Sequence, residues 1–276
     1  MKKVLGLIIS QRKLGNSELL VKEIMRSIPF DCNYELIRLT DMNIQSCTAC
    51  YACLNSDNGC ALKDDFNFVM NKINQSDALI IGVPVYLLGP QGCYKVFSDR
   101  LVAGFKYAPF TAGKPCIVVV PYGVKGWEGY TKAASLVMPR LLQMKIIDFW
   151  PVYATLPGES LMDPANIAYA NNLAKRLFKE EAYTPGKREC PYCGSDLFRL
   201  HEGDKIECPL CGVEGKLQDD NLPCFPLTNA SRFTRDNILE HFDGWVRDMK
   251  KKFHKEKAIL KEIQKAYRDM DWWIKP

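Results

Sequence analysis

Four cysteines lie close together near the start of the chain, at Cys47, Cys50, Cys53 and Cys60. Three follow one another at three-residue steps, and the fourth comes after a short excursion. Because a [4Fe–4S] cluster takes one thiolate at each iron corner, one compact loop of this kind can wrap it. A structural zinc site more often uses two separated C-x2-C pairs. The spacing therefore favours an iron–sulfur cluster over the alternatives, which are zinc, a redox-active thiol group or the remnant of a lost cluster.

Four more cysteines form two near-identical knuckles, with 14 residues between the inner pair: Cys190, Cys193, Cys208 and Cys211. A glycine follows the second cysteine of each knuckle, which lets the turn direct N–H groups toward sulfur. This spacing is typical of tetrahedral four-cysteine metal sites. The sequence favours structural zinc, because so short a module has little core of its own. Rubredoxin-type iron, which uses similar knuckles, stays open as the alternative.

A polar loop follows the first apolar run and leads directly into an amphipathic stretch. A helix N-terminus offers unpaired N–H groups and partial positive charge, so a phosphate can bind there. The loop is neither G-x-x-x-x-G-K-[ST] nor G-x-G-x-x-G, which disfavours ATP and Rossmann-type dinucleotides. An ordinary βα loop capped by Asn16 or Ser17 is the alternative to a phosphate site. The residues predicted to bind are Ser10, Arg12, Leu14, Gly15, Asn16 and Ser17.

Two further loops have the composition to cover and edge a planar ring. The third apolar run ends in Pro84, Val85, Tyr86, Leu87, Leu88 and Gly89. The fourth is followed by a glycine-containing loop with Tyr122, Gly123, Gly126 and Trp127. Aromatic and apolar side chains there can lie on a ring, while the backbone bonds its polar edge. No residue can be assigned as a general acid or base.

These loops sit between alternating strand-like and helix-like segments in the first 180 residues. Five βα units of this kind predict an α/β fold, a doubly wound five-stranded parallel sheet with helices on both faces. Ligands of such folds bind beyond the carboxyl ends of the strands. The predicted strands are 3–9, 34–39, 78–83, 116–121 and 146–153, and the predicted helices 17–28, 65–74, 90–103, 129–143 and 163–181.

The composition divides the chain into three parts. Residues 1–182 are predicted to form the α/β domain, 186–218 a small four-cysteine ribbon, and 228–276 a helical tail. The formal charge of +5 is concentrated in the tail. Its basic run 250–257 is interpreted as a solvated helix face rather than a nucleic-acid surface.

The segment from Ser76 to Arg100, including Pro84-Val85-Tyr86, resembles the flavin-ring segment of the NAD(P)H-dependent FMN reductase and flavodoxin-like family. The loop 10–17 is similar to that family's phosphate loop. It departs from the pattern at Ile9, where the family has glycine, and at Gln11, where it has proline. The resemblance implies a flavodoxin-like fold and FMN as cofactor.

The first cysteine group and its sequel, Ala61 to Asp65, resemble the iron–sulfur flavoproteins of archaea and bacteria. That resemblance covers residues 1 to about 180. It implies a [4Fe–4S] cluster near FMN, and a homodimer or homotetramer with flavins at subunit contacts. The module of the second cysteine group resembles a zinc ribbon.

We therefore expect an FMN- and [4Fe–4S]-dependent oxidoreductase that passes electrons between a donor, ferredoxin or NAD(P)H, and a small acceptor. One alternative is a flavin or quinone reductase without a cluster. Another is a redox-responsive nucleic-acid-binding protein that uses the ribbon and the basic tail. No apolar run reaches 18 residues and the apolar start is short, so we expect a cytoplasmic protein without membrane contact.

Overall fold

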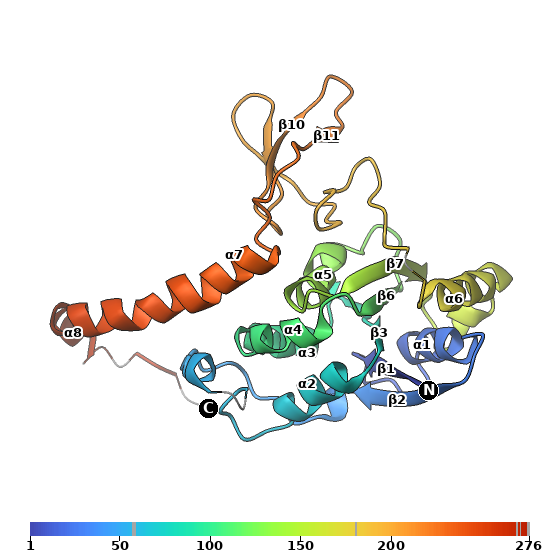
Figure 1. The fold of residues 1–276 in the computed structure, drawn as a ribbon, viewed down its shortest axis with the longest axis horizontal. Coiled ribbons are helices and arrows are strands. Elements are labelled where there is room, and N and C mark those ends of the chain that lie inside the picture. Colours follow the sequence, from blue (N-terminus) through green and yellow to red (C-terminus); the bar gives the residue numbers. More distant parts are fainter. Residues whose placement is uncertain (57–58, 180, 269, 271, 275–276) are drawn as a thin grey trace.

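A computed structural model describes residues 1–56, 59–179, 181–268, 270 and 272–274. The predicted tail also includes residues 269, 271, 275 and 276, which lie outside this description. Five strands form a parallel sheet in the order β2-β1-β3-β6-β7 (Figure 1). This order is flavodoxin-like, and the predicted fold class is confirmed. The strands are β1 (Lys2–Ile8), β2 (Cys32–Arg38), β3 (Ala78–Gly82), β6 (Pro115–Tyr122) and β7 (Lys145–Tyr153).

The central strands are apolar almost throughout because both faces of the sheet are covered. All five residues of β3 are buried. Side chains of β1 alternate between the faces, as the pleat requires. Leu5 and Leu7 belong to one apolar core, whereas Val4 and Ile8 belong to the other.

Helices fill both layers. One core contains residues of α1 (Asn16–Arg26) and α6 (Pro164–Arg176). The other contains residues of α2 (Phe66–Gln75), α3 (Gly92–Ser98) and α5 (Thr131–Leu141). Short α4 (Ala108–Thr111) precedes β6.

Helix α6 begins as its sequence predicts. The side chain of Asp163 accepts a hydrogen bond from the backbone N–H of Ala165, and Pro164 occupies the first turn. Proline has no backbone N–H, but the first turn of a helix makes no intrahelical hydrogen bond that would need one.

Short irregular elements lie at the carboxyl ends of the strands. A small antiparallel hairpin, β4 (Val85–Tyr86) and β5 (Gly89–Pro90), follows β3. The sequence predicted a loop there. Single 3-10 turns follow β2 (39–41) and β7 (159–161), and others lie before α2 (52–55) and after α3 (99–102 and 104–106).

The second cysteine group lies in a separate layer, which we call the ribbon (residues 190–224; Figure 1). Its four strands are antiparallel in the order β11-β10-β9-β8. They are β8 (Arg199–Leu200), β9 (Lys205–Glu207), β10 (Glu214–Leu217) and β11 (Pro223–Cys224). Arg140 of α5 donates from Nε to the carbonyl of Cys193 at 3.3 Å, which ties the ribbon to the α/β domain.

The tail is helical from α7 (Arg235–Leu239) through a π-helical segment (Glu240–Val246) to α8 (Arg247–Arg268). These elements run as one rod in Figure 1. Ile238, Phe242 and Val246 pack against Leu54 of the first cysteine group's loop. Arg247 donates from Nη2 to the Leu54 carbonyl at 3.0 Å. No helix in the described part of the chain has the length and apolar character that crossing a membrane requires.

Candidate functional site

A groove of about 230 Å³ opens at the carboxyl ends of β1, β3, β6 and β7. Ligand sites of open α/β sheets lie at this edge. Three predicted loops meet there, although they are far apart in the sequence. The groove is lined by Ser10, Arg12, Gly15, Asn16, Ser17, Pro84, Val85, Tyr86, Pro121, Tyr122, Gly123, Val124, Ala154 and Thr155.

Six predicted contact residues do not line this groove: Leu14, Leu87, Leu88, Gly89, Gly126 and Trp127. Leu87 and Trp127 are exposed. The structure adds Ala154 and Thr155, which sequence reasoning missed. The sequence could have indicated them, because they directly follow the fifth predicted strand, at whose carboxyl end ligands bind. The assignment of individual residues to cofactor contacts stays a prediction.

The first turn of α1 is open to an anion. Gly15 is the N-cap and therefore offers no side chain to cap the helix; none does so among the described residues. The first intrahelical bond runs from the N–H of Leu19 to the carbonyl of Gly15, so the N–H groups before it are left for another acceptor. A phosphate fits this end because it accepts several such bonds and meets the positive end of the helix dipole.

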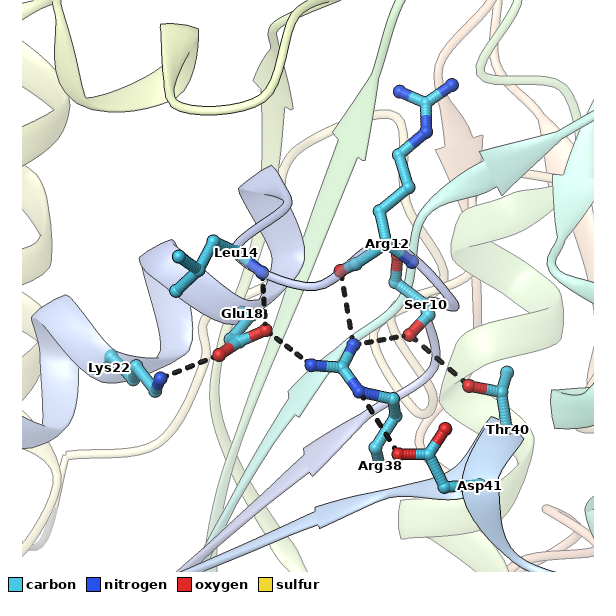
Figure 2. A network of polar contacts seen from close by, with 8 residues as sticks. All are labelled: Ser10, Arg12, Leu14, Glu18, Lys22, Arg38, Thr40 and Asp41. Atoms are coloured by element: carbon cyan, nitrogen blue, oxygen red, sulfur yellow. Dashed lines mark hydrogen bonds and ion pairs between the residues drawn. The ribbon is translucent and has the colours of Figure 1, made fainter.

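A charged network lies behind this loop (Figure 2). Arg38, at the end of β2, donates from Nη1 to the carbonyls of Ser10 at 2.7 Å and Arg12 at 3.1 Å. Its Nη2 donates to Glu18 at 2.5 Å. Glu18 also accepts from the backbone N–H of Leu14 at 2.8 Å. Arg38 thereby fixes two carbonyls of the loop, and Glu18 fixes the Leu14 N–H.

Glu18 is ionised in this network. Burial by itself raises the pKa of its carboxyl, but hydrogen bonds from Lys22, Arg38 and Leu14 outweigh it and lower the pKa to about 2. Sequence reasoning missed all three charged residues. The i,i+4 spacing of Glu18 and Lys22 was visible, whereas the approach of Arg38 depends on β2 lying beside β1.

Asn16 uses its side chain within the protein. It donates to the carbonyl of Leu156 at 2.9 Å and accepts from the N–H of Gly158 at 3.0 Å. It therefore ties the start of α1 to the loop after β7. Its contribution to an anion site is its backbone N–H.

The hairpin β4–β5 turns through two residues with left-handed backbone, Leu87 (φ 45°) and Leu88 (φ 67°). Leucine is strained in this region, and such strain is commonly held at functional sites. Gly129 lies directly against this turn. A Cβ on Gly129 would come within 2.0 Å of the Leu88 carbonyl oxygen, so only glycine fits. Tyr130 donates its N–H to that same oxygen at 2.9 Å.

We call residues 47–60, of which 57 and 58 lie outside the description, the cysteine loop. Cys47 and Cys50 are exposed, Cys53 is buried and Cys60 is half-buried. All four nonetheless line one small pocket, of about 30 Å³. Ala49 (φ 51°) and Tyr51 (φ 54°) adopt left-handed backbone there. The loop thus brings its four cysteines to the lining of one pocket, and a [4Fe–4S] cluster takes one thiolate at each iron corner.

A buried ion pair adjoins this pocket. Arg100, in the turn after α3, lines it together with the four cysteines. Arg100 and Asp64 form an ion pair whose side chains are 0% exposed. Arg100 ends the segment that resembles the family's flavin-ring segment, but no spacing pattern in the sequence relates it to the cysteines.

The four ribbon cysteines are fully buried, and their sulfur atoms all lie within 4.8 Å of one another. The Cys190–Cys211 and Cys193–Cys208 sulfur pairs are each 3.5 Å apart. Sulfur atoms about 2.3 Å from one tetrahedral metal ion would be separated by about 3.8 Å. The predicted ligand set is therefore assembled around a single point.

The chain resembles several known proteins. The profile of the NADPH-dependent FMN reductase family matches residues 2–151. An iron–sulfur flavoprotein of Methanocaldococcus jannaschii is 33% identical over 99 residues, which cover 36% of this chain and 51% of that protein. An iron–sulfur flavoprotein of Archaeoglobus fulgidus is 41% identical over 66 residues, covering 24% of this chain and 32% of that protein. The chain thus spans about half or less of these relatives' lengths.

A solved structure matches nearly the whole chain. A protein described as a flavone reductase superposes with a TM-score of 0.78 at 21% identity, covering 99% of both chains. Its likeness establishes the fold, with the ribbon and tail included. The profile match covers more than half of this chain, and it includes the cysteine loop and all groove residues except Ala154 and Thr155. The chain belongs to the NADPH-dependent FMN reductase family.

Proposed function

We propose that this protein is a flavin oxidoreductase that holds FMN in the groove and a [4Fe–4S] cluster in the cysteine loop. One observation carries the proposal: four cysteines from a single loop line one pocket in the same domain as an uncapped helix start. When bound, FMN supplies two-electron chemistry and a cluster supplies one-electron chemistry. The names of the two archaeal relatives support the pairing.

The residues have separate tasks in this proposal. The N–H groups at the start of α1 and the Arg12 side chain bind the phosphate of FMN. Tyr86 and Tyr122, which line the groove, contact its flavin ring. Arg38 and Glu18 hold the loop in shape. The ribbon holds zinc, which shapes the module and takes no part in electron transfer.

The donor is ferredoxin or NAD(P)H, and the acceptor is a small molecule. We further propose a homodimer or homotetramer, which light scattering of the purified protein tests. A protein that is monomeric at all working concentrations would remove the oligomer from the proposal.

Anaerobic purification followed by flavin, iron, sulfide and zinc analysis tests the cofactors together. We expect one FMN, about four irons with equal sulfide, and one zinc per chain. A flavin spectrum without iron or sulfide would leave a cluster-free flavin or quinone reductase. Salt-dependent binding of DNA or RNA would instead favour the nucleic-acid alternative.

A second candidate concerns the acceptor. The full-length likeness to a flavone reductase favours a planar aromatic enone as the acceptor's chemical class. Anaerobic mixing of the reduced holoprotein with a flavone tests this. Stoichiometric reoxidation of the flavin with loss of the enone absorbance supports it, and an unchanged reduced spectrum refutes it.

A further inference from the structure

Arg100 is held in an enclosed, fully constrained position beneath the cysteine loop. Its Nη2 donates to Asp64 at 2.9 Å, and its Nη1 donates to Asp64 and to the Gln45 carbonyl, the latter at 3.2 Å. Its guanidinium lies 4.3 Å from the centre of the Phe66 ring. A planar, two-pronged pairing of this kind fixes the orientation of the guanidinium.

Asp64 is built to hold that arginine. Burial by itself raises the pKa of Asp64, but hydrogen bonds from Arg100 and from the backbone of Gln45 and Phe66 lower it overall. The N–H of Gln45 donates to Asp64 at 2.8 Å, and that of Phe66 at 3.2 Å. The carboxylate therefore stays ionised and buried, and it anchors both ends of the segment that carries the cysteines.

One donor of Arg100 is left over. Its Nε–H is buried and has no hydrogen-bond partner among the described residues. Leaving a buried donor without a hydrogen-bond partner is unfavourable, so its retention calls for a partner in the working protein. The neighbour with spare accepting capacity is Cys60, whose side chain lines the same pocket as Arg100.

We propose that Arg100 is a positioning residue for the cluster: its Nε–H donates a hydrogen bond to sulfur at the Cys60 corner, and its fixed charge raises the cluster's reduction potential. This inference rests on the proposed function. A hydrogen bond to cluster sulfur and a nearby positive charge both favour the reduced, more negative cluster. Asp64 keeps the guanidinium in place and in the charged state.

The test is a redox titration of the anaerobically purified holoprotein, followed by electron paramagnetic resonance for the cluster and absorbance for the flavin. In Arg100→Met, we expect the cluster's reduced-to-oxidised ratio at a given potential to fall at least tenfold, which is a 59 mV lower midpoint. The flavin midpoint should stay unchanged. A second variant, Arg100→Lys, keeps a positive charge beside Asp64 but lacks the planar guanidinium. Its cluster midpoint should lie between those of the wild type and Arg100→Met.

Arg176→Gln is the matched control, because Arg176 pairs with buried Asp148 at 2.9 Å on the opposite face of the sheet. It should lower the melting temperature without moving the cluster potential. If Arg100→Met does not fold, Arg100→Lys decides the question by the same midpoint measurement.

The outcomes separate the two proposals. Wild-type protein without iron and sulfide would refute the proposed function. Wild-type protein with a cluster, but with the same midpoint in the folded Arg100 variant, would refute this inference alone. A lower melting temperature with an unmoved potential would make Arg100 a purely structural residue.

Discussion

The two cysteine groups have the same number of ligands and opposite designs. In the ribbon, all four sulfur atoms are buried and lie within 4.8 Å of one another. In the cysteine loop, two cysteines are exposed, and the four surround a pocket rather than a point. The ribbon suits one ion, whereas the loop suits an object that binds each sulfur at a different corner.

The two groups also meet the same backbone requirement by different means. Each ribbon knuckle turns at a glycine with positive φ, Gly194 (80°) and Gly212 (76°). The cysteine loop makes its left-handed turns at Ala49 and Tyr51, which carry side chains. Glycine makes the ribbon knuckles unstrained, while the loop depends on its surroundings to hold its shape.

The largest expected effect comes from removing one ligand of each group. Cys208→Ser should abolish metal binding in the ribbon and unfold it, because structural zinc contributes about 10–16 kcal/mol to such modules. Cys53→Ser should abolish the iron and sulfide but leave the α/β domain folded with FMN bound. Metal analysis and limited proteolysis measure both. Unfolding of the α/β domain in Cys53→Ser would contradict the contrast.

Exposure predicts a difference in rate. Cys47 and Cys50 are exposed, whereas the four ribbon cysteines are 0% exposed. A chelator added to the holoprotein should therefore remove iron at least about tenfold faster than it removes the ribbon metal. Loss of iron and zinc can be followed together by their chelator complexes. Equal rates, or faster loss of zinc, would show that the two groups are equally protected.

The Glu18 network behind the phosphate loop should affect folding stability independently of both cysteine groups. Because the pKa of Glu18 is lowered to about 2, its stabilising effect is present above the unfolded value of about 4.5 and is lost as the pH falls toward 2. Glu18→Gln should cost about 2 kcal/mol at neutral pH and progressively less below pH 4.5 or so.

Urea unfolding of wild type and variant at a series of pH values checks this. Any loss of metal at low pH occurs in both the wild type and Glu18→Gln, so it cancels in the difference between their free energies of unfolding. The iron and zinc content should be the same in both at neutral pH. A difference that grows as the pH falls would contradict the sign of the shift.

The smallest effects concern the backbone turns. Gly194→Ala should destabilise the ribbon by about 1 kcal/mol, because it places a side chain at φ 80° and 3.2 Å from Tyr183. Ala49→Gly should stabilise the cysteine loop by about 0.5 kcal/mol, since strain is relieved at an entropic cost. Thermal unfolding of the two holoproteins compares them. If Gly194→Ala stabilised its holoprotein or Ala49→Gly destabilised its own, the contrast between unstrained ribbon turns and strained loop turns would be wrong.

The sheet could be predicted from sequence, and so could the grouping of each set of four cysteines, because strands and cysteine knuckles are set by local spacing. Asp163 and Pro164 likewise announced α6. The charged network could not be predicted: Arg38 reaches the phosphate loop only because β2 lies beside β1. The hairpin after β3 depends on the contact between Gly129 and Leu88, 41 residues apart, and no local pattern encodes such a contact.

The cover of the cysteine loop has a consequence for how the protein is made. Leu54 is packed by Phe242 and its neighbours, and its carbonyl binds an arginine 193 residues further along the chain. At about 5–20 residues per second of synthesis, that partner leaves the ribosome roughly 10–40 seconds after the loop. During this interval the nascent loop stands open to whatever would supply a metal centre. The last helices to be synthesised then pack against a loop that belongs to the first domain to be made.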